Sequence, residues 1–257
     1  ITVGADHKLE VNAQAIEILA NIEKPIAVVG VAGMYRTGKS YLLNRVILNR
    51  NSGFGVGPTI NPCTKGIWMW GRPLKGQTAE GEIVNVIVLD SEGLAAVDQD
   101  NSHDSRIFSL VMLLSSIFIY NSVGSIDEQA LENLSLVVNL TKNIHIKSSG
   151  NEELDFEDFS YYMPYFMWVV RDFALQLVDS EDETISSRQY LESALQDQKG
   201  FSEQTEQKNH IRHLLRAFFK ERNCYTMVRP VTDEASLRNL EHADPSQLRP
   251  EFVEQVV

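Results

Sequence analysis

The chain has 257 residues, of which 43% are apolar, and a formal net charge of -12 at neutral pH. Because affinity for a phosphate backbone needs clustered Lys and Arg, this acidic balance argues against a nucleic-acid-binding protein. Cys63 and Cys224 lie far apart in sequence, so they predict neither a disulfide framework nor a zinc site, and they favour a reducing, cytoplasmic compartment. The longest apolar stretch, 107–120, contains three serines and is shorter than the roughly 18 residues of a membrane span.

The first half of the chain alternates predicted strands and helices. Residues 24–33 (KPIAVVGVAG) are typical of a strand buried on both faces, and a helix is predicted from about Gly38. Residues 51–66 hold four glycines and two prolines and predict a long loop, a kind of loop that is usually functional. Residues 67–70 and 82–90 are predicted strands joined by a polar hairpin connection.

The second half continues the alternation. Residues 107–120 predict a helix that runs into a buried strand, and 125–142 predict an amphipathic helix. A further strand is expected over 163–173 and a last short one over 224–228. Helices are expected around 186–198 and 206–222, and the tail from Thr232 should be polar and partly helical. Such alternation predicts an α/β protein with a mostly parallel central sheet and helices on both faces.

Residues 33–40 (GMYRTGKS) match the phosphate-binding loop pattern G-x-x-x-x-G-K-S without a mismatch. In such a loop, backbone N–H groups surround the phosphates, Lys39 supplies a cation, and the Ser40 hydroxyl can hold Mg²⁺. The position between a predicted buried strand and a helix favours this interpretation over a glycine turn that binds nothing. The fold class predicted is therefore the three-layer α/β fold of P-loop nucleoside triphosphatases.

A second phosphate-side element follows the apolar run Val86–Leu89. Asp90 ends this predicted strand and can hold the metal through water, while the N–H of Gly93 can contact a γ-phosphate. Thr64, in the long loop, can complete the Mg²⁺ shell with its hydroxyl, which makes the loop a switch. The predicted metal ligands are thus Ser40, Thr64 and Asp90. A buried strand that ends in a solvated aspartate is the alternative.

The base-binding residues are harder to predict, because no Asn-Lys-x-Asp motif is present. Residues 169–172 (VVRD) end a predicted strand, and ligands of doubly wound sheets meet the carboxyl ends of strands. The Asp172 carboxylate could accept hydrogen bonds from N1–H and the exocyclic amine of guanine, whereas adenine offers an unprotonated N1. A surface ion pair of Arg171 with Asp172 is the alternative.

Five segments together resemble the guanylate-binding proteins, large GTPases of the dynamin superfamily: GMYRTGKSYLLN (33–44), CTKGIWMW (63–70), LDSEGL (89–94), LLSSIFIYNS (113–122) and RPEFV (249–253). The resemblance, from about residue 24 to the end, implies a Mg²⁺-dependent enzyme that binds GTP and hydrolyses it to GDP. It also implies a homodimer formed through the nucleotide face. We expect one large G domain over 1–257, a fragment of a longer protein whose helical region is absent, with no indication of membrane contact.

The resemblance also assigns catalytic residues. The family's P-loop arginine falls on Arg36, its switch threonine on Thr64 and its switch glutamate on Glu92, and these join Lys39 as the expected catalytic set. Since Leu94 cannot orient a water as a glutamine would, we expect Arg36 to act as an arginine finger supplied in cis. The alternative is that Arg36 pairs with an acidic neighbour.

The family's base-reading pair falls on Arg171 and Asp172, and Arg229–Pro230 match the start of the segment that caps the guanine and joins the dimer contact. The residues expected to contact the nucleotide are Gly33, Tyr35, Arg36, Thr37, Gly38, Lys39, Ser40, Tyr41, Thr64, Gly93, Arg171, Asp172, Arg229 and Pro230.

Two departures from the family pattern keep other functions open. Pro62, which has no hydroxyl, replaces a serine that helps to place the attacking water. Asp233 stands where the better-known vertebrate members carry a basic residue. GMP formation therefore stays open, and so does a nucleotide-gated interaction module with little or no hydrolysis. A P-loop ATPase or nucleotide kinase is the other rival, and it predicts adenine preference with no effect of Asp172.

Overall fold

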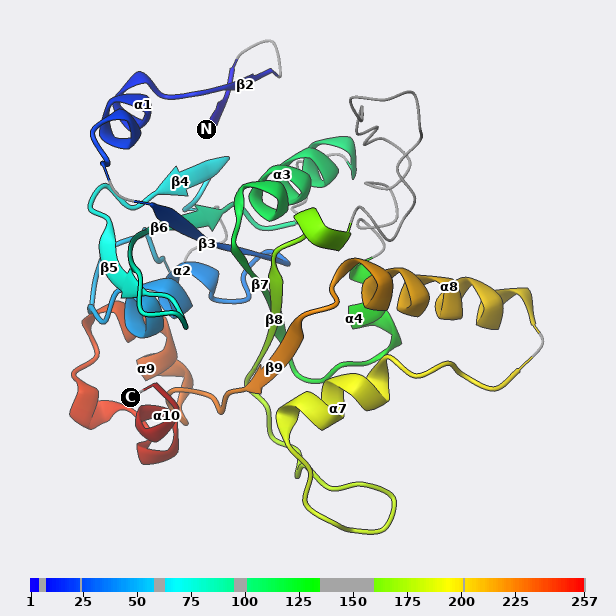
Figure 1. The fold of residues 1–257 in the computed structure, drawn as a ribbon. Helices are drawn as coiled ribbons and strands as arrows, with labels where there is room; N and C mark the ends of the chain where they lie inside the picture. The colour runs from blue at the N-terminus through cyan, green and yellow to red at the C-terminus, as the bar shows by residue number, and fades with distance from the viewer. Residues whose placement is uncertain are drawn as a thin grey trace, which may run out of the picture.

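The computed structural model describes residues 1–4, 8–23, 25–57, 63–94, 101–134, 160–200 and 202–256. Its centre is a seven-stranded sheet with the order β4-β6-β3-β7-β8-β9, in which β5 also pairs with β6 (Figure 1). The antiparallel strands are β4 (Ile67–Met69) and β5 (Leu74–Gln77), both paired with β6. The parallel strands are β3 (Ile26–Gly33), β6 (Ile83–Ser91), β7 (Ile117–Val123), β8 (Tyr165–Arg171) and β9 (Arg222–Thr226). The prediction of a mostly parallel sheet is confirmed.

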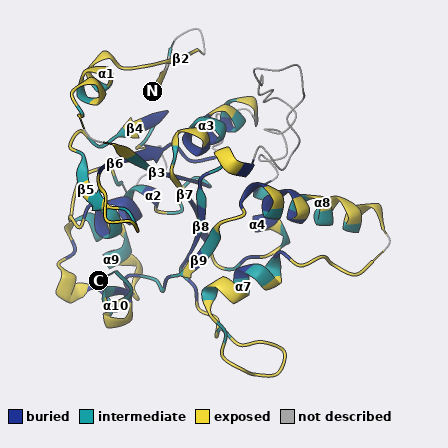
Figure 2. Cartoon of the chain, in the orientation of Figure 1, coloured by how far each residue is buried: buried dark blue, intermediate teal, exposed yellow. Residues whose placement is uncertain are grey.

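The central strands alternate their side chains between two apolar layers. Val29 and Val31 of β3 belong to one core cluster and Ala32 to the other. Gly30 lies below α3, where an added Cβ would come within 2.3 Å of Ser115 Oγ and 2.8 Å of Val111 Cγ1. Glycine at this position therefore lets the helix approach the sheet closely. Figure 2 shows the same central strands as the most deeply buried part of the chain.

Helices cover both faces of the sheet, as expected (Figure 1). The first face carries α3 (Asn101–Leu114), α4 (Glu128–Asn133), α7 (Ser187–Ala194) and α8 (Glu203–Phe218). The other carries α2 (Lys39–Leu42), a π-helical turn (Leu43–Ile47), α9 (Glu234–Arg238) and α10 (Pro250–Val256). Short 3₁₀ turns lie at Ser160–Tyr162, Leu240–His242 and Pro245–Gln247. This is the three-layer arrangement that the sequence predicted.

The N-terminal elements were not predicted. Strands β1 (Thr2–Val3) and β2 (Leu9–Glu10) form a separate antiparallel pair, and α1 (Ala13–Ala20) follows. Asn12 caps α1 by accepting hydrogen bonds from Gln14 N and Ala15 N, at 2.9 and 3.2 Å. A cap of this kind is a recognisable start signal. None of the residues of α1 is buried, so the helix lies outside the buried core.

Several predicted boundaries need correction. The connection over residues 71–81 was expected to be only a hairpin link, but it contains β5. That edge strand is polar and includes a glycine, so its apolar alternation is faint. Helix α8 begins at Glu203, because the Ser202 side chain caps it by accepting from Thr205 N, and it ends at Phe218, before β9. The predicted helix over 125–142 is seen as α4, and its part from residue 135 lies outside the described residues. None of the helices within the described ranges is long and apolar enough to cross a bilayer.

Candidate functional site

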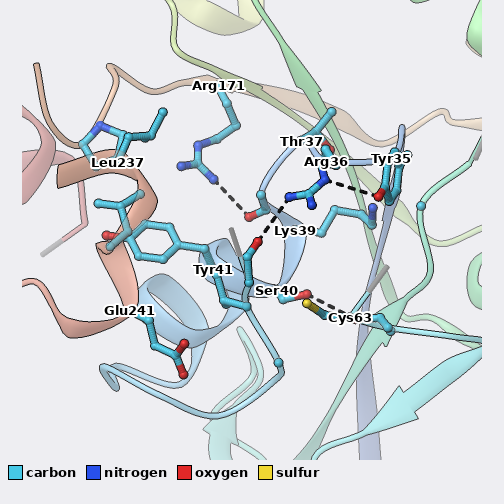
Figure 3. Close-up of a pocket in the computed structure, with 18 of the residues that line it drawn as sticks. Tyr35, Arg36, Thr37, Lys39, Ser40, Tyr41, Cys63, Arg171, Leu237 and Glu241 are labelled. Carbon is cyan, nitrogen blue, oxygen red and sulfur yellow. Dashed lines mark hydrogen bonds between the residues drawn. The ribbon is translucent and has the colours of Figure 1, made fainter. Parts of the chain in front are cut away.

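A pocket of about 500 Å³ lies at the carboxyl ends of the parallel strands (Figure 3). The P-loop lies at the end of β3. Ser91 is the last residue of β6, Gly93 lies two residues further on, and Arg171 ends β8. Because parallel strands end at the same edge of a sheet, these three segments meet although the sequence separates them widely. The predicted phosphate side and the predicted base side therefore line one pocket.

Contacts within the chain fix the backbone of the P-loop. Gly38 begins α2 in the left-handed conformation, with φ 78°, and Gly33 has φ 152°. A Cβ on Gly33 would come within 2.1 Å of the Asn121 carbonyl oxygen, so only glycine fits there. Asn121 Nδ2 donates to the Thr37 carbonyl oxygen at 2.9 Å, and Thr37 Oγ1 donates to the Met34 carbonyl oxygen at 2.8 Å. These contacts preorganise the loop that is expected to surround the phosphates.

Lys39 is 7% exposed, and its Nζ donates to the Met34 carbonyl oxygen at 3.1 Å. Burial lowers its pKa from 10.5 to about 8, although the nearby carboxylates of Asp90 and Glu92 oppose the shift. A buried ammonium group with one neutral oxygen as hydrogen-bond partner is suited to receive an anion. The position agrees with the predicted role of Lys39 as the cation of the phosphate site.

The three predicted metal ligands meet at one point. Ser40 Oγ donates to Asp90 Oδ2 at 2.7 Å, Thr64 Oγ1 donates to the same oxygen at 3.0 Å, and the two hydroxyl oxygens are 3.4 Å apart. Burial raises the pKa of Asp90, against the lowering effects of Ser40, Lys39 and Thr64. Its Oδ1 is buried and has no hydrogen-bond partner among the described residues. An orphaned carboxylate oxygen beside two hydroxyls fits a hard cation such as Mg²⁺.

Glu92 takes a different place from the other predicted catalytic residues. It is 3% exposed, and its side chain is not among those that line the pocket. Gly66 N donates to Glu92 Oε2 at 2.8 Å, and the His103 ring nitrogen Nε2 meets the other carboxylate oxygen. Both oxygens are thus engaged on the far side of the Thr64 loop, and the catalytic role of Glu92 stays a prediction.

The segment after β6 is joined directly to the P-loop. Tyr35 N donates to the Leu94 carbonyl oxygen at 2.9 Å, and Leu94 N donates to the Gly33 carbonyl oxygen at 3.1 Å. A Cβ on Gly93 would lie 2.4 Å from Tyr35 Cα, closer than any side-chain atom can come. Gly93 therefore permits this contact between the two phosphate-side segments, and it also lines the pocket, as predicted.

Arg36 is exposed at the rim of the pocket in a left-handed conformation, with φ 63°. Its Nη1 donates to the Gly57 carbonyl oxygen at 3.2 Å, and its Nε donates to Tyr35 Oη at 3.3 Å. Among the described residues no acidic side chain pairs with it, so the alternative of an acidic neighbour finds no support there. Both hydrogen-bond partners of the guanidinium in the described part of the chain are neutral groups.

At the other end of the pocket, Arg171 is buried and Asp172 is half-buried. Arg171 Nη1 donates to the Gly38 carbonyl oxygen at 3.4 Å, and its guanidinium lies 5.9 Å from the centroid of the Tyr41 ring. Burial lowers the pKa of Arg171, and its Nε has no hydrogen-bond partner among the described residues. Asp172 has φ 55° and lines the pocket. Because Arg171 is 4% exposed, the pair is not an ordinary surface ion pair.

The C-terminal tail lines this end of the pocket. The resemblance assigned only its start, Arg229–Pro230, to the segment that caps the guanine, and it gave no role to the later residues. The tail residues that line the pocket are Pro230, Leu237, Arg238, Asn239, Leu240, Glu241 and His242. The contacts that anchor the tail include a hydrogen bond from Arg45 Nη2 to the Ala243 carbonyl oxygen, at 2.7 Å, and the packing of the Tyr41 and Phe252 rings, whose centroids lie 6.4 Å apart. Figure 3 shows Leu237 and Glu241 across the pocket from Cys63 and Tyr35. Apolar residues such as Leu237 and Leu240 in this polar segment are the sequence signal that it turns inward.

The two residues predicted at the beginning of the tail lie in different surroundings. Pro230 lines the pocket, but Arg229 does not, and its Nη2 donates to Glu234 Oε1 at 2.7 Å. That hydrogen bond raises the pKa of Arg229. Asp233, which departs from the family pattern, caps α9 by accepting from Ser236 N at 2.8 Å. Pro62, the other departure, lies outside the described residues.

A phosphate-binding loop, an aspartate at the end of the neighbouring parallel strand and a buried base-side arginine define a P-loop nucleotide-binding domain of the three-layer α/β class. The chain belongs to the guanylate-binding protein family. It matches the family model described as "Guanylate-binding protein, N-terminal domain" over residues 6–257. This confirms the resemblance found in the sequence and extends it to the N-terminal elements.

Relatives in vertebrates agree with this assignment. The chain is 42% identical over 252 residues to Guanylate-binding protein 1 of Chlorocebus aethiops, which covers 97% of this chain and 42% of that protein. It is 42% identical over 249 residues to Guanylate-binding protein 3 of Mus musculus, covering 96% and 39%. It is 41% identical over 254 residues to Guanylate-binding protein 1 of Homo sapiens, covering 97% and 42%. The chain thus spans about two fifths of the length of these relatives.

Proposed function

We propose that this chain is a GTPase domain that binds guanine nucleotide and hydrolyses GTP to GDP with Mg²⁺. The observation that carries the proposal is the convergence of the Ser40 and Thr64 hydroxyls on the Asp90 carboxylate, close to the buried ammonium of Lys39. Membership of the guanylate-binding protein family supports guanine as the base. The proposed base reader is Asp172, which lines the pocket beside Arg171.

In this proposal the position of each residue in the pocket determines its role. Lys39 and the P-loop N–H groups hold the phosphates, and Ser40, Thr64 and Asp90 would hold Mg²⁺, which neutralises charge on the phosphate oxygens. Arg36 leaves the Gly57 carbonyl and turns its guanidinium toward the charge that develops during phosphoryl transfer. Because its partners are neutral, that movement breaks no ion pair. Glu92 contributes indirectly, because it binds the main chain of the loop that carries Thr64 and does not line the pocket.

Nucleotide-dependent dimerisation through the nucleotide face is part of the proposal. Arg36 and Cys63 are exposed at the rim of the pocket, so a partner seated there would cover Arg36 and exclude water from it. Both cysteines are free thiols, which is consistent with a reducing, cytoplasmic location.

Product analysis tests the proposal. The purified chain is incubated with GTP and with ATP, each with and without Mg²⁺, and GTP, GDP and GMP are separated by chromatography at several protein concentrations. We expect GDP from GTP alone, only with Mg²⁺, at a rate per molecule that rises with protein concentration. Lys39→Ala should abolish the reaction and serves as the matched control.

Two other outcomes would contradict the proposal in different ways. GTP that is bound but stays intact at every concentration would indicate a nucleotide-gated interaction module. Hydrolysis of ATP that equals that of GTP would indicate an unselective P-loop ATPase and would remove the proposed role of Asp172. A rate per molecule that does not change with concentration would remove only the dimerisation.

A further inference from the structure

Glu92 is joined to the Thr64 loop by two hydrogen bonds with Gly66. The N–H of Gly66 donates to Glu92 Oε2 at 2.8 Å, and the N–H of Glu92 donates to the Gly66 carbonyl oxygen at 2.9 Å. Gly66 is buried, with φ 74°, and a Cβ there would come within 2.2 Å of the Ile1 carbonyl oxygen. The main chain is therefore closely constrained only two residues after Thr64.

The second oxygen of the Glu92 carboxylate faces α3. Its partner is Nε2 of His103, whose side chain is 14% exposed while that of Glu92 is 3% exposed. Because a carboxylate oxygen only accepts, the ring nitrogen supplies the proton of this hydrogen bond. A carboxylate buried to this degree needs partners for both oxygens, and His103 supplies one that Gly66 cannot.

We propose that His103 is a positioning residue that orients Glu92, so that Glu92 holds Gly66 and, through it, Thr64. The contacts form one path from α3 through His103, Glu92 and Gly66 to Thr64, which ends at Asp90 Oδ2. Neither His103 nor Glu92 lines the pocket, so the path acts on the metal side of the site without touching the nucleotide. The inference rests on the proposed function for its effect on turnover, but not for its effect on the loop.

The path requires that the side chain at position 103 place a hydrogen-bond donor where Nε2 of His103 lies. Glutamine can do so with its amide N–H₂, whereas alanine and leucine cannot. Without the donor, the Glu92 carboxylate loses one of its partners and can rotate away from Gly66, which releases the loop that carries Thr64.

Hydrogen exchange of the backbone amides in residues 64–67, measured on the nucleotide-free chain, tests the path directly. We expect His103→Ala to speed exchange of the Gly66 amide about tenfold and His103→Gln to leave it near that of the wild type. His210→Ala, at an exposed histidine of α8, is the matched control and should change nothing. His103→Leu fills the same space without a donor and replaces the alanine variant if the latter does not fold.

Steady-state GTP hydrolysis provides the second measurement. His103→Ala and His103→Leu should lower kcat about tenfold with KM little changed, and His103→Gln should restore kcat. Unchanged Gly66 exchange in both donor-free variants would overturn the inference, as would kcat and KM falling together without rescue by glutamine. If the wild type hydrolyses no GTP, the proposed function fails, and the exchange measurement alone decides whether His103 holds the loop.

Discussion

Arg36 donates a hydrogen bond from Nη1 to the main-chain carbonyl oxygen of Gly57, at 3.2 Å, and so links the P-loop to the glycine-rich loop across the mouth of the pocket. The contact joins the guanidinium to a neutral main-chain group at the rim of the pocket. A guanidinium binds an anionic oxygen more strongly than a neutral carbonyl oxygen. A negatively charged group in the pocket would therefore draw the Arg36 guanidinium away from the Gly57 carbonyl.

Replacement of Arg36 tests the arginine finger. Arg36→Ala should lower kcat for GTP roughly 10³-fold, since fingers of this type contribute about 10³ to 10⁵ in rate. The dissociation constant for GTP should change far less, because the proposed role of the guanidinium is to meet charge that develops only during phosphoryl transfer. The measurement compares single-turnover hydrolysis with equilibrium binding of a fluorescent GTP analogue.

Tyr35→Phe is the control for Arg36, because it removes only the hydroxyl that accepts from Arg36 Nε. It should leave both the rate and the affinity close to those of the wild type. Losses of equal size in rate and affinity for Arg36→Ala would show that Arg36 only helps to bind the nucleotide.

Nucleotide affinity should decrease as the pH rises through about 8, where free Lys39 loses its proton. Phosphates next to the ammonium raise its pKa, so binding above this pH takes up a proton. Affinity is therefore full below about pH 8 and falls up to about tenfold per pH unit above it. The measurement is the dissociation constant of GDP between about pH 7 and about pH 10.

The same shift affects the free energy of unfolding with the opposite dependence on pH. The pKa of Lys39 in the folded chain is below its ordinary value of 10.5, so the folded state carries a penalty for the buried charge below about pH 8. That penalty disappears between about pH 8 and 10.5, and Lys39→Met should remove both pH dependences. A Lys39→Met variant that keeps the wild-type pH profile of GDP binding would assign the titration to another group.

Asp172→Asn tests base recognition. The amide cannot accept from two donors of guanine as the carboxylate does, so GTP affinity should fall about tenfold to a hundredfold while ATP affinity changes little. Asparagine tolerates the left-handed backbone of Asp172, with φ 55°, so the substitution adds little strain.

Asp182→Asn is the matched control for the base reader, because Asp182 is exposed and has a similar φ of 61°. It should bind both nucleotides as the wild type does. If Asp172→Asn keeps its full preference for GTP over ATP in competition binding, guanine is read by other groups of the pocket.

Gly93→Ala should destabilise the chain by about 1 to 3 kcal/mol, the range for overpacked sites, and weaken nucleotide binding. The new Cβ would lie 2.4 Å from Tyr35 Cα, so the P-loop and the segment after β6 must separate. Gly71→Ala is the control, since its Cβ would meet only Ile18 Cδ1 at 3.9 Å. Urea unfolding and GDP binding measure both effects, and equal stability of the two variants would contradict the proposed close contact.

The predictable part of the site consists of short-range patterns. Residues 33–40 form the phosphate loop of one strand-loop-helix unit. Gly33 ends β3, Gly38 caps α2, and Lys39 and Ser40 are the first residues of that helix. Asp90 could be predicted as the partner of this loop because it ends a run of buried residues, and parallel strands end at one edge. The edge strand β5 escaped prediction because it is only four residues long and consists of Leu74, Lys75, Gly76 and Gln77, so it offers little apolar signal.

By itself the sequence determined the fold class and the phosphate loop, because these depend on local spacing and on buried strands. It predicted Ser40 and Asp90 as metal ligands from the same patterns, whereas Thr64 was predicted only from its place in the long loop between them. Only the tertiary structure decided that His103 contacts Glu92, that Gly93 packs against Tyr35, and which tail residues beyond Pro230 line the base side of the pocket. These contacts join residues whose spacing along the chain follows no helical or strand period. They arise from how the layers pack, and packing depends on the shapes of all the elements together.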